Sequence, residues 1–335
     1  MKSIDLAIIG ATGAVGEAVV ELLEKRNFPV NNLYLLASER TAGTSLMFNN
    51  KPLMVTELKA FDFSNVQLAI FVATDAVSSE ILPLAQSKGC LTIDNSQVFA
   101  DSAPLIVPSV NGQLLAARPE VVVNPDSNAI QLATVLKPFY DEVGIERINV
   151  TAFHSVSGHG KKAIHELASQ TASLLNGRGA EKSVYPQQIA FNVLPYVGQL
   201  GTDGHTDTEK RLLSQTRRLL GDDHLQVSAS CVQVPVFYAD SMMLTIDMKS
   251  SITLECALGI FEKNSEIKIL DDFPGEGFAT PVTHSTGSEK IYLSRIRRDM
   301  SHENSLNLWV TADNVRKSAA FNTILIAEEL IKSYL

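Results

Sequence analysis

The N-terminal segment places the tightest limit on how this chain can fold. The apolar run Ile4–Ile9 predicts a short strand, and the apolar spacing from Ala14 to Lys25 predicts a helix. Between them lies Gly10-Ala11-Thr12-Gly13-Ala14-Val15-Gly16. Glycine permits a tight turn and a close approach of the main chain, and the helix N-terminus offers amides and a favourable dipole to a diphosphate. This order predicts a dinucleotide-binding unit, with a purely structural glycine turn as the alternative.

Strands and helices continue to alternate after this opening. Further strands are predicted at Leu33–Ala37, Leu68–Val72, Cys90–Ile93 and Val121–Val123, with helices at Val77–Gln86 and Ala129–Tyr140. Repeated strand and helix favour an α/β fold with a Rossmann-like, doubly wound parallel sheet. Ligands of such sheets bind at the carboxyl ends of the strands, so the loop that follows Val123 is a candidate site.

The pattern changes in the second half of the chain. Longer strands with two-residue alternation are predicted at Arg147–Phe153, Ser228–Phe237 and Met242–Met248, with helices at about 160–175 and 206–220. They favour a second, α+β domain with a large mixed sheet. The final segment, Asp313–Leu335, is predicted to be helical and to pack back onto the first domain.

Composition excludes several classes of protein. The chain has 335 residues, of which 45% are hydrophobic and 19% charged, so it can bury the cores of two domains. Its net charge of −9 and the lack of a basic run argue against a nucleic-acid partner. No apolar run approaches the roughly 20 residues that span a bilayer. Three scattered cysteines, Cys90, Cys231 and Cys256, suit a reducing compartment without disulfides, so we expect a cytoplasmic protein.

A second loop bears on the choice of cofactor. Ser38-Glu39-Arg40-Thr41 follows the second predicted strand, where proteins that bind NAD often carry an acidic residue for the ribose. Arginine offers a planar set of donors to a ribose 2′-phosphate, and Ser38 adds a hydroxyl. The loop therefore favours NADP over NAD, unless Arg40 is only a solvated charge beside Glu39.

Motifs in one order along nearly the whole chain resemble the aspartate-semialdehyde dehydrogenase family. They include Gly10–Gly16, Ala37–Gly43, Pro108–Asn111, Asn124–Gln131, Val156–Gly160, Ala190–Pro195, Cys231–Val236 and Trp309–Ala320. The resemblance implies a homodimeric enzyme that reduces an acyl-enzyme, made from aspartyl phosphate, with NADPH. It implies an NADP-binding domain over 1–127 and 313–335 and a dimerisation and substrate-pocket domain over 128–312. The cofactor-binding positions are Gly10, Thr12, Gly13, Ala14, Val15, Gly16, Ser38, Arg40, Thr41 and Asn314.

The residues that carry the family's acyl chemistry are replaced. Ser127 stands where the family has its nucleophilic cysteine, and Asp240 stands where it has a histidine base. Gln233 replaces an arginine that binds the substrate carboxylate, and His154 replaces a pocket glutamine. A serine hydroxyl is far more basic than a thiol and needs a dedicated base, and an ordinary ionised carboxylate is a weak one. Ser127 and Asp240 are therefore predicted to occupy the two catalytic positions without performing the family's reaction.

Other pocket positions retain charge. Glu209 and Arg211 match a glutamate that binds the substrate amine and a cation that binds phosphate, with a solvated helical face as the alternative. Thr74 and Asp75 replace two family glycines near the cofactor, where the added side chains could obstruct it. No metal is expected, because three nearby histidines lack short ligand spacing, namely His154, His159 and His165.

Three functions fit these residues. The first is a folded, dimeric, non-catalytic family member that binds NADP, with a small acidic ligand left open as a partner. The second is an NADP-dependent oxidoreductase that acts on an aldehyde or an acyl phosphate with an altered substrate and mechanism. The third is a purely structural protein that binds neither. The joint replacement at Ser127, Asp240, Gln233 and His154 favours the first.

Overall fold

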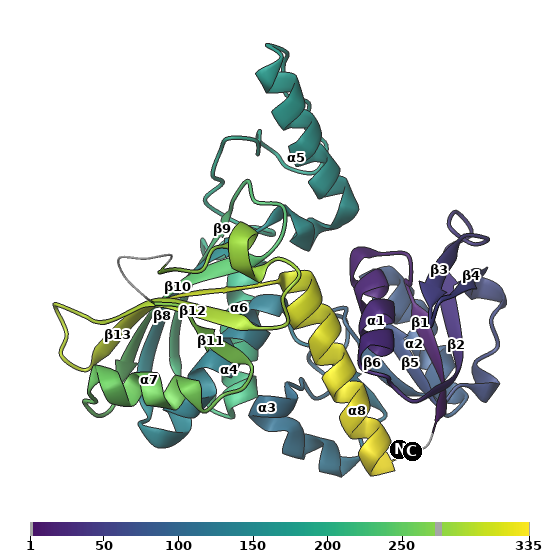
Figure 1. Ribbon diagram of the computed structural model, residues 1–335, viewed down its shortest axis with the longest axis horizontal. Coiled ribbons are helices and arrows are strands. Elements are labelled where there is room, and N and C mark those ends of the chain that lie inside the picture. Colours follow the sequence, from purple (N-terminus) through teal and green to yellow (C-terminus); the bar gives the residue numbers. More distant parts are fainter. Residues whose placement is uncertain (1–2, 272–276, 335) are drawn as a thin grey trace. The chain divides into compact units, whose positions relative to one another are not determined.

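The chain is divided into two compact units. The computed structural model describes residues 3–271 and 277–334. One unit is formed by the residues up to Asp126 together with those from Ala319 onward, and the other is formed by Ser127–Ser318. Each unit contains one large sheet (Figure 1).

The first unit is built on a sheet of seven strands in the order β3-β4-β2-β1-β5-β6-β7. The strands are β1 (Ile4–Ile9), β2 (Val30–Ala37), β3 (Ser45–Phe48), β4 (Lys51–Glu57), β5 (Leu68–Phe71), β6 (Leu91–Asp94) and β7 (Val121–Val123). Neighbours pair in parallel, except that β3 and β4 form an antiparallel hairpin at one edge. The predicted Rossmann-like sheet is confirmed.

The sequence patterns do not predict the hairpin of β3 and β4. Its turn is Asn49-Asn50, whose φ angles are 50° and 59°. Asparagine tolerates this left-handed conformation, which suits a two-residue hairpin turn. Met47 and Met54 are exposed on these short edge strands. Apolar residues thus lie on both faces of these strands, so the sequence lacks the alternation of apolar and polar residues by which a half-buried strand is recognised.

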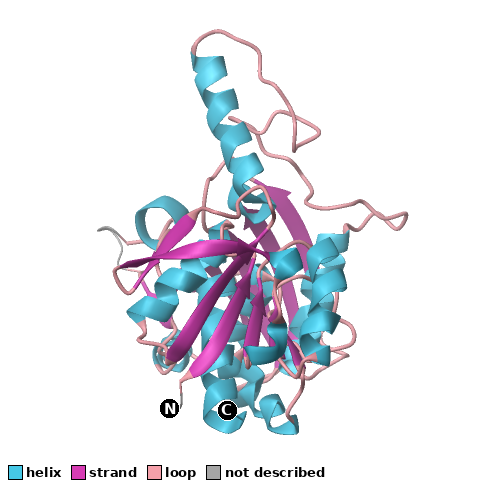
Figure 2. Cartoon of the chain, turned by 90° about the vertical axis from the view of Figure 1, so that its right-hand side faces the viewer, coloured by secondary structure: helices cyan, strands magenta, loops and turns pink. Residues whose placement is uncertain are grey.

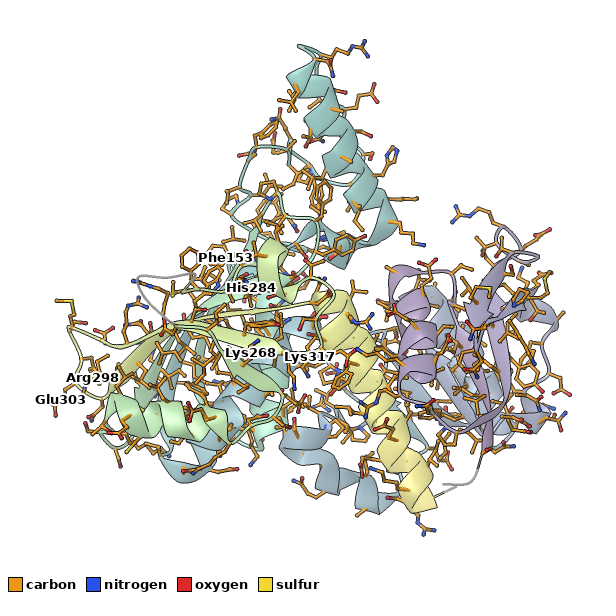
Figure 3. All side chains as sticks on the ribbon, in the orientation of Figure 1. Phe153, Lys268, His284, Arg298, Glu303 and Lys317 are labelled. Atoms are coloured by element: carbon orange, nitrogen blue, oxygen red, sulfur yellow. The ribbon has the colours of Figure 1, made fainter. Side chains whose placement is uncertain are left out.

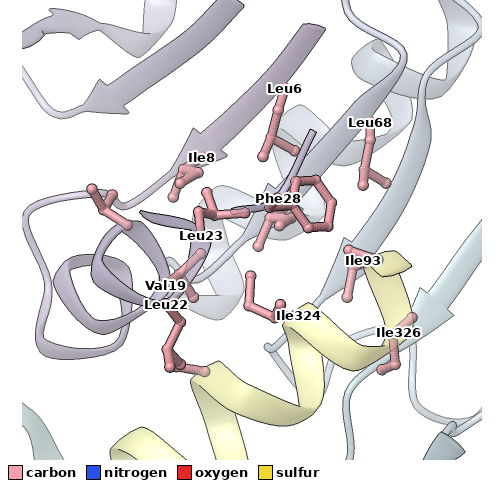
Figure 4. Packing of buried hydrophobic residues seen from close by; sticks show 14 of the residues in the cluster. Leu6, Ile8, Val19, Leu22, Leu23, Phe28, Leu68, Ile93, Ile324 and Ile326 are labelled. Carbon is pink, nitrogen blue, oxygen red and sulfur yellow. The ribbon is translucent and has the colours of Figure 1, made fainter. Parts of the chain in front are cut away.

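Helices cover both faces of this first sheet. Alternate residues of β1 point to opposite faces, so Leu6 and Ile8 enter one core while Ala7 and Ile9 enter another. Helices α1 (Ala14–Lys25) and α8 (Asn322–Tyr334) share the core of Leu6 and Ile8 (Figure 4). Helix α2 (Asp75–Ser87) packs in the other core. The unit is completed by α3 (Pro108–Asn111) and by 3-10 turns at Leu58–Ala60, Phe63–Asn65 and Gly112–Ala117.

From Ala319 onward the C-terminal segment belongs to the first unit, whereas residues 313–318 of the predicted segment belong to the second. Leu330 and Ile331 of α8 are buried in its core, and Glu328 pairs with Arg26 of α1. The two bonds of that pair measure 2.6 and 2.8 Å. The segment is not one uniform helix, because residues Asn314–Phe321 form π-helical turns before α8 begins.

The second unit is built on a mixed sheet of six strands in the order β11-β12-β13-β10-β8-β9. The strands are β8 (Ile145–His154), β9 (Gln226–Gln233), β10 (Asp240–Met248), β11 (Ile267–Ile269), β12 (Ile291–Arg298) and β13 (Ser305–Ala312). Two outer pairs, β8 with β9 and β11 with β12, are parallel, and the remaining pairs are antiparallel. Helices α4 (Ser127–Glu142), α6 (Asp207–Leu220) and α7 (Leu254–Glu262) pack against it. The predicted α+β domain with a large mixed sheet is confirmed.

Two strands of this sheet differ from their predicted bounds. The predicted strand Ser228–Phe237 ends at Gln233, and β10 begins at Asp240 rather than Met242. Pro235 has no N–H to donate to a ladder, which explains why the strand pattern breaks there although apolar residues continue. Strands β12 and β13 are absent from the sequence-based expectation. In Figure 3 their connection is marked by Arg298, whose guanidinium donates to the main-chain oxygen of Glu303 at 2.6 Å.

Helix α5 (Gly160–Leu175) projects from the second sheet together with the long loop that follows it (Figures 1 and 2). A small apolar cluster, including Leu167 and Ile189, joins the helix to this loop. Glu166 adds a polar clamp, because its carboxylate accepts from the amide and hydroxyl of Ser183 at 3.0 and 2.7 Å. Burial opposes the charge of Glu166, but the donors from the loop outweigh it and lower the pKa of the carboxyl.

Candidate cofactor site and acyl pocket

The glycine-rich loop of the first unit can be built only from glycine at two positions. Gly10 has a φ of +90°, and a Cβ there would lie 2.6 Å from the main-chain oxygen of Val72. A Cβ on Gly16 would lie 2.4 Å from the main-chain oxygen of Gly10. Both distances are shorter than real contacts, so the loop packs main chain directly against main chain. This close packing is the arrangement that leaves room for a diphosphate.

The amides that would hold the diphosphate are those of Ala14, Val15 and Gly16 at the first turn of α1. Amides of a first helical turn have no carbonyl partner within the helix. Gly13 precedes the helix in an extended conformation, without a side chain that could cap those amides. The helix dipole adds partial positive charge at the same place. The loop therefore fits an anionic dinucleotide, as the sequence predicts.

The Ser38–Thr41 loop lies beside the glycine loop. The hydroxyl of Thr12 donates to that of Thr41 at 3.2 Å and joins the two loops. Ser38 and Arg40 are exposed. Within the described residues the Arg40 guanidinium has no ion-pair partner, which leaves it available to a phosphate. The Thr12–Thr41 hydrogen bond thus joins the two loops that carry the predicted cofactor residues of this unit.

Thr74 and Asp75 come directly after the segment that touches Gly10. The main chain of Val72 and Ala73 packs on that glycine, and Thr74 then forms the N-cap of α2. Both Thr74 and Asp75 are exposed. The predicted obstruction of the cofactor by these side chains stays a prediction.

Ser127 is the first residue of α4, in the second unit. Its hydroxyl donates to the main-chain oxygen of Asn314 at 3.0 Å. No nitrogen base bonds to this hydroxyl among the described residues. The bond to a carbonyl holds the proton on the serine oxygen, whereas a nucleophile needs a base that removes it.

Asp240, the predicted base position, is buried and already engaged. One carboxylate oxygen accepts from the amide and the hydroxyl of Ser155, each at 2.8 Å. The other accepts from the side-chain amide of Asn128 at 2.9 Å. Burying a carboxylate is tolerated when donors surround it in this way. Asp240 therefore works as the acceptor at the centre of a polar network, and no bond joins it to Ser127 within the part of the chain that the structure describes.

His154 and Gln233 lie next to this network. They are paired residues of the parallel strands β8 and β9, and both side chains are buried. The amide of Gln233 donates to the main-chain oxygen of His154 at 2.7 Å. His154 Nδ1 lies 3.3 Å from the Asn128 amide nitrogen and 4.0 Å from Asp240 Oδ2. The structure thus brings together three of the predicted pocket positions, namely Asp240, His154 and Gln233.

Asn314, predicted to bind the cofactor, belongs to the same unit as Ser127. Its side-chain oxygen accepts from the hydroxyl of Ser157 at 3.0 Å and from the amide of Ala239 at 3.2 Å. These contacts hold the turn before β10. Asn314 therefore contacts Ser127 and the turn before Asp240, and contact with a cofactor stays a prediction.

Glu209 and Arg211 are helical residues with partners of their own. Glu209 forms a capping box with Thr206 at the start of α6, and its other carboxylate oxygen accepts from the amide of Cys231 at 3.1 Å. Arg211 is about one-third exposed and lies 3.7 Å from Asp207. The capping box explains Glu209 without a ligand. Binding of a substrate amine or phosphate by this pair stays a prediction.

Two residues of the network escape sequence reasoning. Asn128 and Ser155 follow directly on Ser127 and His154, and both are fully buried beside Asp240. A polar residue inside an otherwise apolar helix or at a strand end is the only signal that the sequence offers. The pKa of Tyr185 is raised, first by burial of its hydroxyl and then by the negative charges of Glu166 and Asp240.

Ala239 carries strain that a glycine would remove. Its φ is 70°, a left-handed conformation that costs a residue with a Cβ about 1–2 kcal/mol. Glycine loses more chain entropy on folding, which offsets about 0.5–1 kcal/mol of that gain. We expect Ala239→Gly to raise the free energy of unfolding by about 0.5–1 kcal/mol in urea titration.

Ala163→Gly in helix α5 is the matched control for this change, because glycine weakens a helix interior by about 1 kcal/mol. The two variants carry the same substitution with opposite expected signs. A loss of stability in Ala239→Gly as large as that of Ala163→Gly contradicts the assignment of strain.

Metal ligands and membrane spans are not found in the described structure. Among residues 3–271 and 277–334, no three His, Cys, Asp or Glu side chains are grouped as metal ligands. None of the helices described in those ranges is long and apolar enough to cross a bilayer.

Two family models match most of the chain. Residues 5–118 match the NAD-binding domain of semialdehyde dehydrogenases, and residues 136–317 match their dimerisation domain. The first unit therefore contains an NAD(P)-binding domain.

Curated relatives match over their full length. Aspartate-semialdehyde dehydrogenase of Legionella pneumophila is 42% identical over 100% of this chain and 97% of its own length. Aspartate-semialdehyde dehydrogenase 2 of Vibrio cholerae is 42% identical, with 99% of each chain covered.

Solved structures agree with this relationship. Aspartate semialdehyde dehydrogenase II of Vibrio cholerae, in complex with ASA, superposes with a TM-score of 0.96 at 42% identity and full coverage of both chains. The enzyme of Candida albicans with NADP shares the fold alone, with a TM-score of 0.76 at 19% identity over 99% of both chains. The chain described above belongs to the aspartate-semialdehyde dehydrogenase family.

Proposed function

We propose that this chain binds NADP and does not carry out the acyl transfer of the semialdehyde dehydrogenase reaction. The observation that carries the proposal is the hydroxyl of Ser127, which donates to a main-chain oxygen instead of a base. The carboxylate of Asp240 supports it, because three donors already occupy its two oxygens. Loss of a nucleophile together with its base removes about four to six orders of magnitude in rate.

Cofactor binding is proposed at the two joined loops of the first unit. Gly10, Thr12, Gly13, Ala14, Val15 and Gly16 would hold the diphosphate, and Ser38, Arg40 and Thr41 would hold the ribose phosphate. NADP supplies or accepts a hydride when it is bound. The support is the pair of glycines that admit no Cβ and the exposed guanidinium of Arg40. We assign the pocket to Ser127, His154, Gln233 and Asp240, with Glu209, Arg211 and Asn314 as further positions.

A homodimer is part of the same proposal. The second unit matches a dimerisation-domain model over residues 136–317. The loop after α5 also exposes apolar side chains, since Phe191 and Leu200 are each 66% exposed. Apolar residues gathered in one loop are typical of a surface that a partner covers.

An oxidoreductase with an altered substrate and mechanism is the second candidate. Its support is the 42% identity to proteins named as aspartate-semialdehyde dehydrogenases, together with the intact glycine loop. This reading would assign an aldehyde or an acyl phosphate as substrate. It requires either a nucleophile other than a thiolate or a reaction without a covalent intermediate.

A turnover assay separates the two candidates. Purified protein is mixed with aspartate semialdehyde, phosphate and NADP, and NADPH is followed by absorbance. We expect no rate above a blank without protein, and none in Ser127→Cys, because no base contacts position 127 in the described structure. Calorimetric titration of the same sample is expected to show NADP binding. Turnover on the order of 1 per second in the wild-type chain overturns the proposal.

The Ser127→Ala variant decides what any residual turnover means. Activity that disappears in Ser127→Ala assigns the nucleophile to this serine and supports the altered enzyme. A sample that shows neither NADP binding nor turnover instead supports a structural role.

A further inference from the structure

Polar atoms of two buried pocket residues, one on each of β8 and β9, have no hydrogen-bond partner among the described residues. They are Nε2 of His154 and Oε1 of Gln233. The two residues are only 9% and 1% exposed. A buried polar atom without a partner loses its water and gains nothing in return, so it needs a physical explanation, and a bound group supplies one.

The neighbouring bonds fix His154 Nε2 as a hydrogen-bond donor. The Asp240 carboxylate only accepts, so the Asn128 atom that faces it at 2.9 Å is the amide nitrogen. The same nitrogen lies 3.3 Å from His154 Nδ1, and an amide nitrogen donates but does not accept. Nδ1 therefore accepts, and in the neutral imidazole the hydrogen resides on Nε2.

Gln233 presents the complementary group. Its Nε2 lies 2.7 Å from the main-chain oxygen of His154, which can only accept. The remaining atom, Oε1, is then an acceptor. His154 and Gln233 are direct partners in the parallel pairing of β8 and β9, so their side chains leave the same face of the sheet.

We propose that His154 and Gln233 together bind the primary carboxamide of a small ligand. A carboxamide accepts through its oxygen, which matches His154 Nε2–H, and donates through its nitrogen, which matches Gln233 Oε1. A carboxylate accepts only, so it would leave Gln233 Oε1 facing another acceptor. This inference rests on the proposed function, in which position 233 has lost the arginine that binds a carboxylate.

Charge favours the same ligand. Asp240 is buried, and its Oδ2 lies 4.0 Å from the imidazole of His154. A second carboxylate bound at His154 would meet this negative charge where little water screens it. A neutral amide meets no such repulsion. The hydrogen-bond pattern and the charge of Asp240 therefore both select against a carboxylate and favour a carboxamide.

The test compares two ligands of equal size that differ only in having a side-chain carboxamide or a side-chain carboxylate. L-asparagine and L-aspartate are titrated into the purified chain with NADP present, and binding is measured by calorimetry. We expect L-asparagine to bind at least about tenfold more tightly. Equal or tighter binding of L-aspartate overturns the proposal. Failure of both ligands to bind at millimolar concentration, or a crystal structure with only ordered water between the two side chains, also overturns it.

Variants test the two groups separately. His154→Phe keeps an aromatic ring without the donor and is expected to weaken L-asparagine about tenfold with little change for L-aspartate. His224→Phe, at an exposed turn, is the matched control and should change neither. Gln233→Arg should reverse the preference toward L-aspartate. Unchanged preference in both pocket variants contradicts the assignment.

The ratio of L-asparagine affinity to L-aspartate affinity is independent of catalysis. Turnover of aspartate semialdehyde would refute the proposed function without changing the ratio of the two ligand affinities. A ratio near one would refute the carboxamide site while leaving the proposed function intact.

Discussion

Asp240→Ala is expected to lower the free energy of unfolding by about 3–5 kcal/mol. The carboxylate accepts three bonds, two from Ser155 and one from Asn128, and it is only 3% exposed. Its removal leaves the Ser155 amide without its acceptor and takes one acceptor each from the Ser155 hydroxyl and the Asn128 amide. Each buried donor left unpaired costs about 1–3 kcal/mol. Water that enters the vacated space offsets part of that sum. Urea denaturation followed by circular dichroism measures the change.

Two further variants test whether the loss of stability comes from the buried carboxylate of Asp240. Asp240→Asn keeps one acceptor oxygen and is expected to lose about 1–3 kcal/mol, between the wild type and alanine. Asp223→Ala removes a carboxylate from an exposed turn and should stay within about 0.5 kcal/mol of the wild type. If Asp240→Ala unfolds like Asp223→Ala, the carboxylate is not the centre of the network.

The same bonds affect a variant designed to carry the residues that the family has at these positions. A neutral histidine at position 240 has one acceptor nitrogen, whereas three donors now point at this position. Ser127→Cys combined with Asp240→His and Gln233→Arg therefore changes the packing of Ser155 and Asn128 as well as the chemistry. We expect the triple variant to be less stable than the wild type, so its activity must be compared at equal folded fraction.

Gly10→Ala is expected to weaken NADP binding by at least about 100-fold, or about 2.7 kcal/mol. The added Cβ would lie 2.6 Å from the main-chain oxygen of Val72 and 2.9 Å from its carbonyl carbon. Neither atom belongs to a flexible side chain, so the glycine loop must move away from Val72. The φ of +90° adds a cost for any residue with a Cβ. Calorimetric titration with NADP measures the affinity.

Graded glycine variants separate the clash from a general effect of alanine. A Cβ on Gly13 would lie 3.3 Å from the main-chain oxygen of Gly10, so Gly13→Ala should weaken binding less than Gly10→Ala. Gly259→Ala in α7 meets nothing within 4 Å and should leave NADP affinity unchanged. Thermal unfolding of each variant checks that the protein is folded. Wild-type affinity in folded Gly10→Ala contradicts the assigned cofactor loop.

Local signals in the sequence determined the first unit well. Strand β1, helix α1 and strand β7 have the bounds that the sequence predicts. A buried parallel strand is a short apolar run, and a glycine-rich turn next to a helix start is a local feature, so both can be recognised without knowledge of distant residues. The hairpin of β3 and β4 is not predicted, because exposed methionines interrupt the alternation of apolar and polar residues on its short strands.

The candidate pocket could be assembled only in part from the sequence. Resemblance to the family identified Ser127, His154, Gln233 and Asp240 as a set. It gave no bonds, so it left open whether Asp240 could act as a base for Ser127. Asn128 and Ser155, which hold the Asp240 carboxylate, lie 112 and 85 residues from it in the chain. No local pattern connects residues so far apart.

The sequence by itself determined the fold class and the glycine loop and predicted which pocket residues are replaced, because each rests on local spacing or on matched motifs. The tertiary structure alone decided what those residues do to one another. Pairing of β8 with β9 sets His154 beside Gln233, and the turn at Ala239 brings Asp240 onto Ser155. Hydrogen-bond partners in a buried pocket depend on positions in space, which only the folded chain supplies.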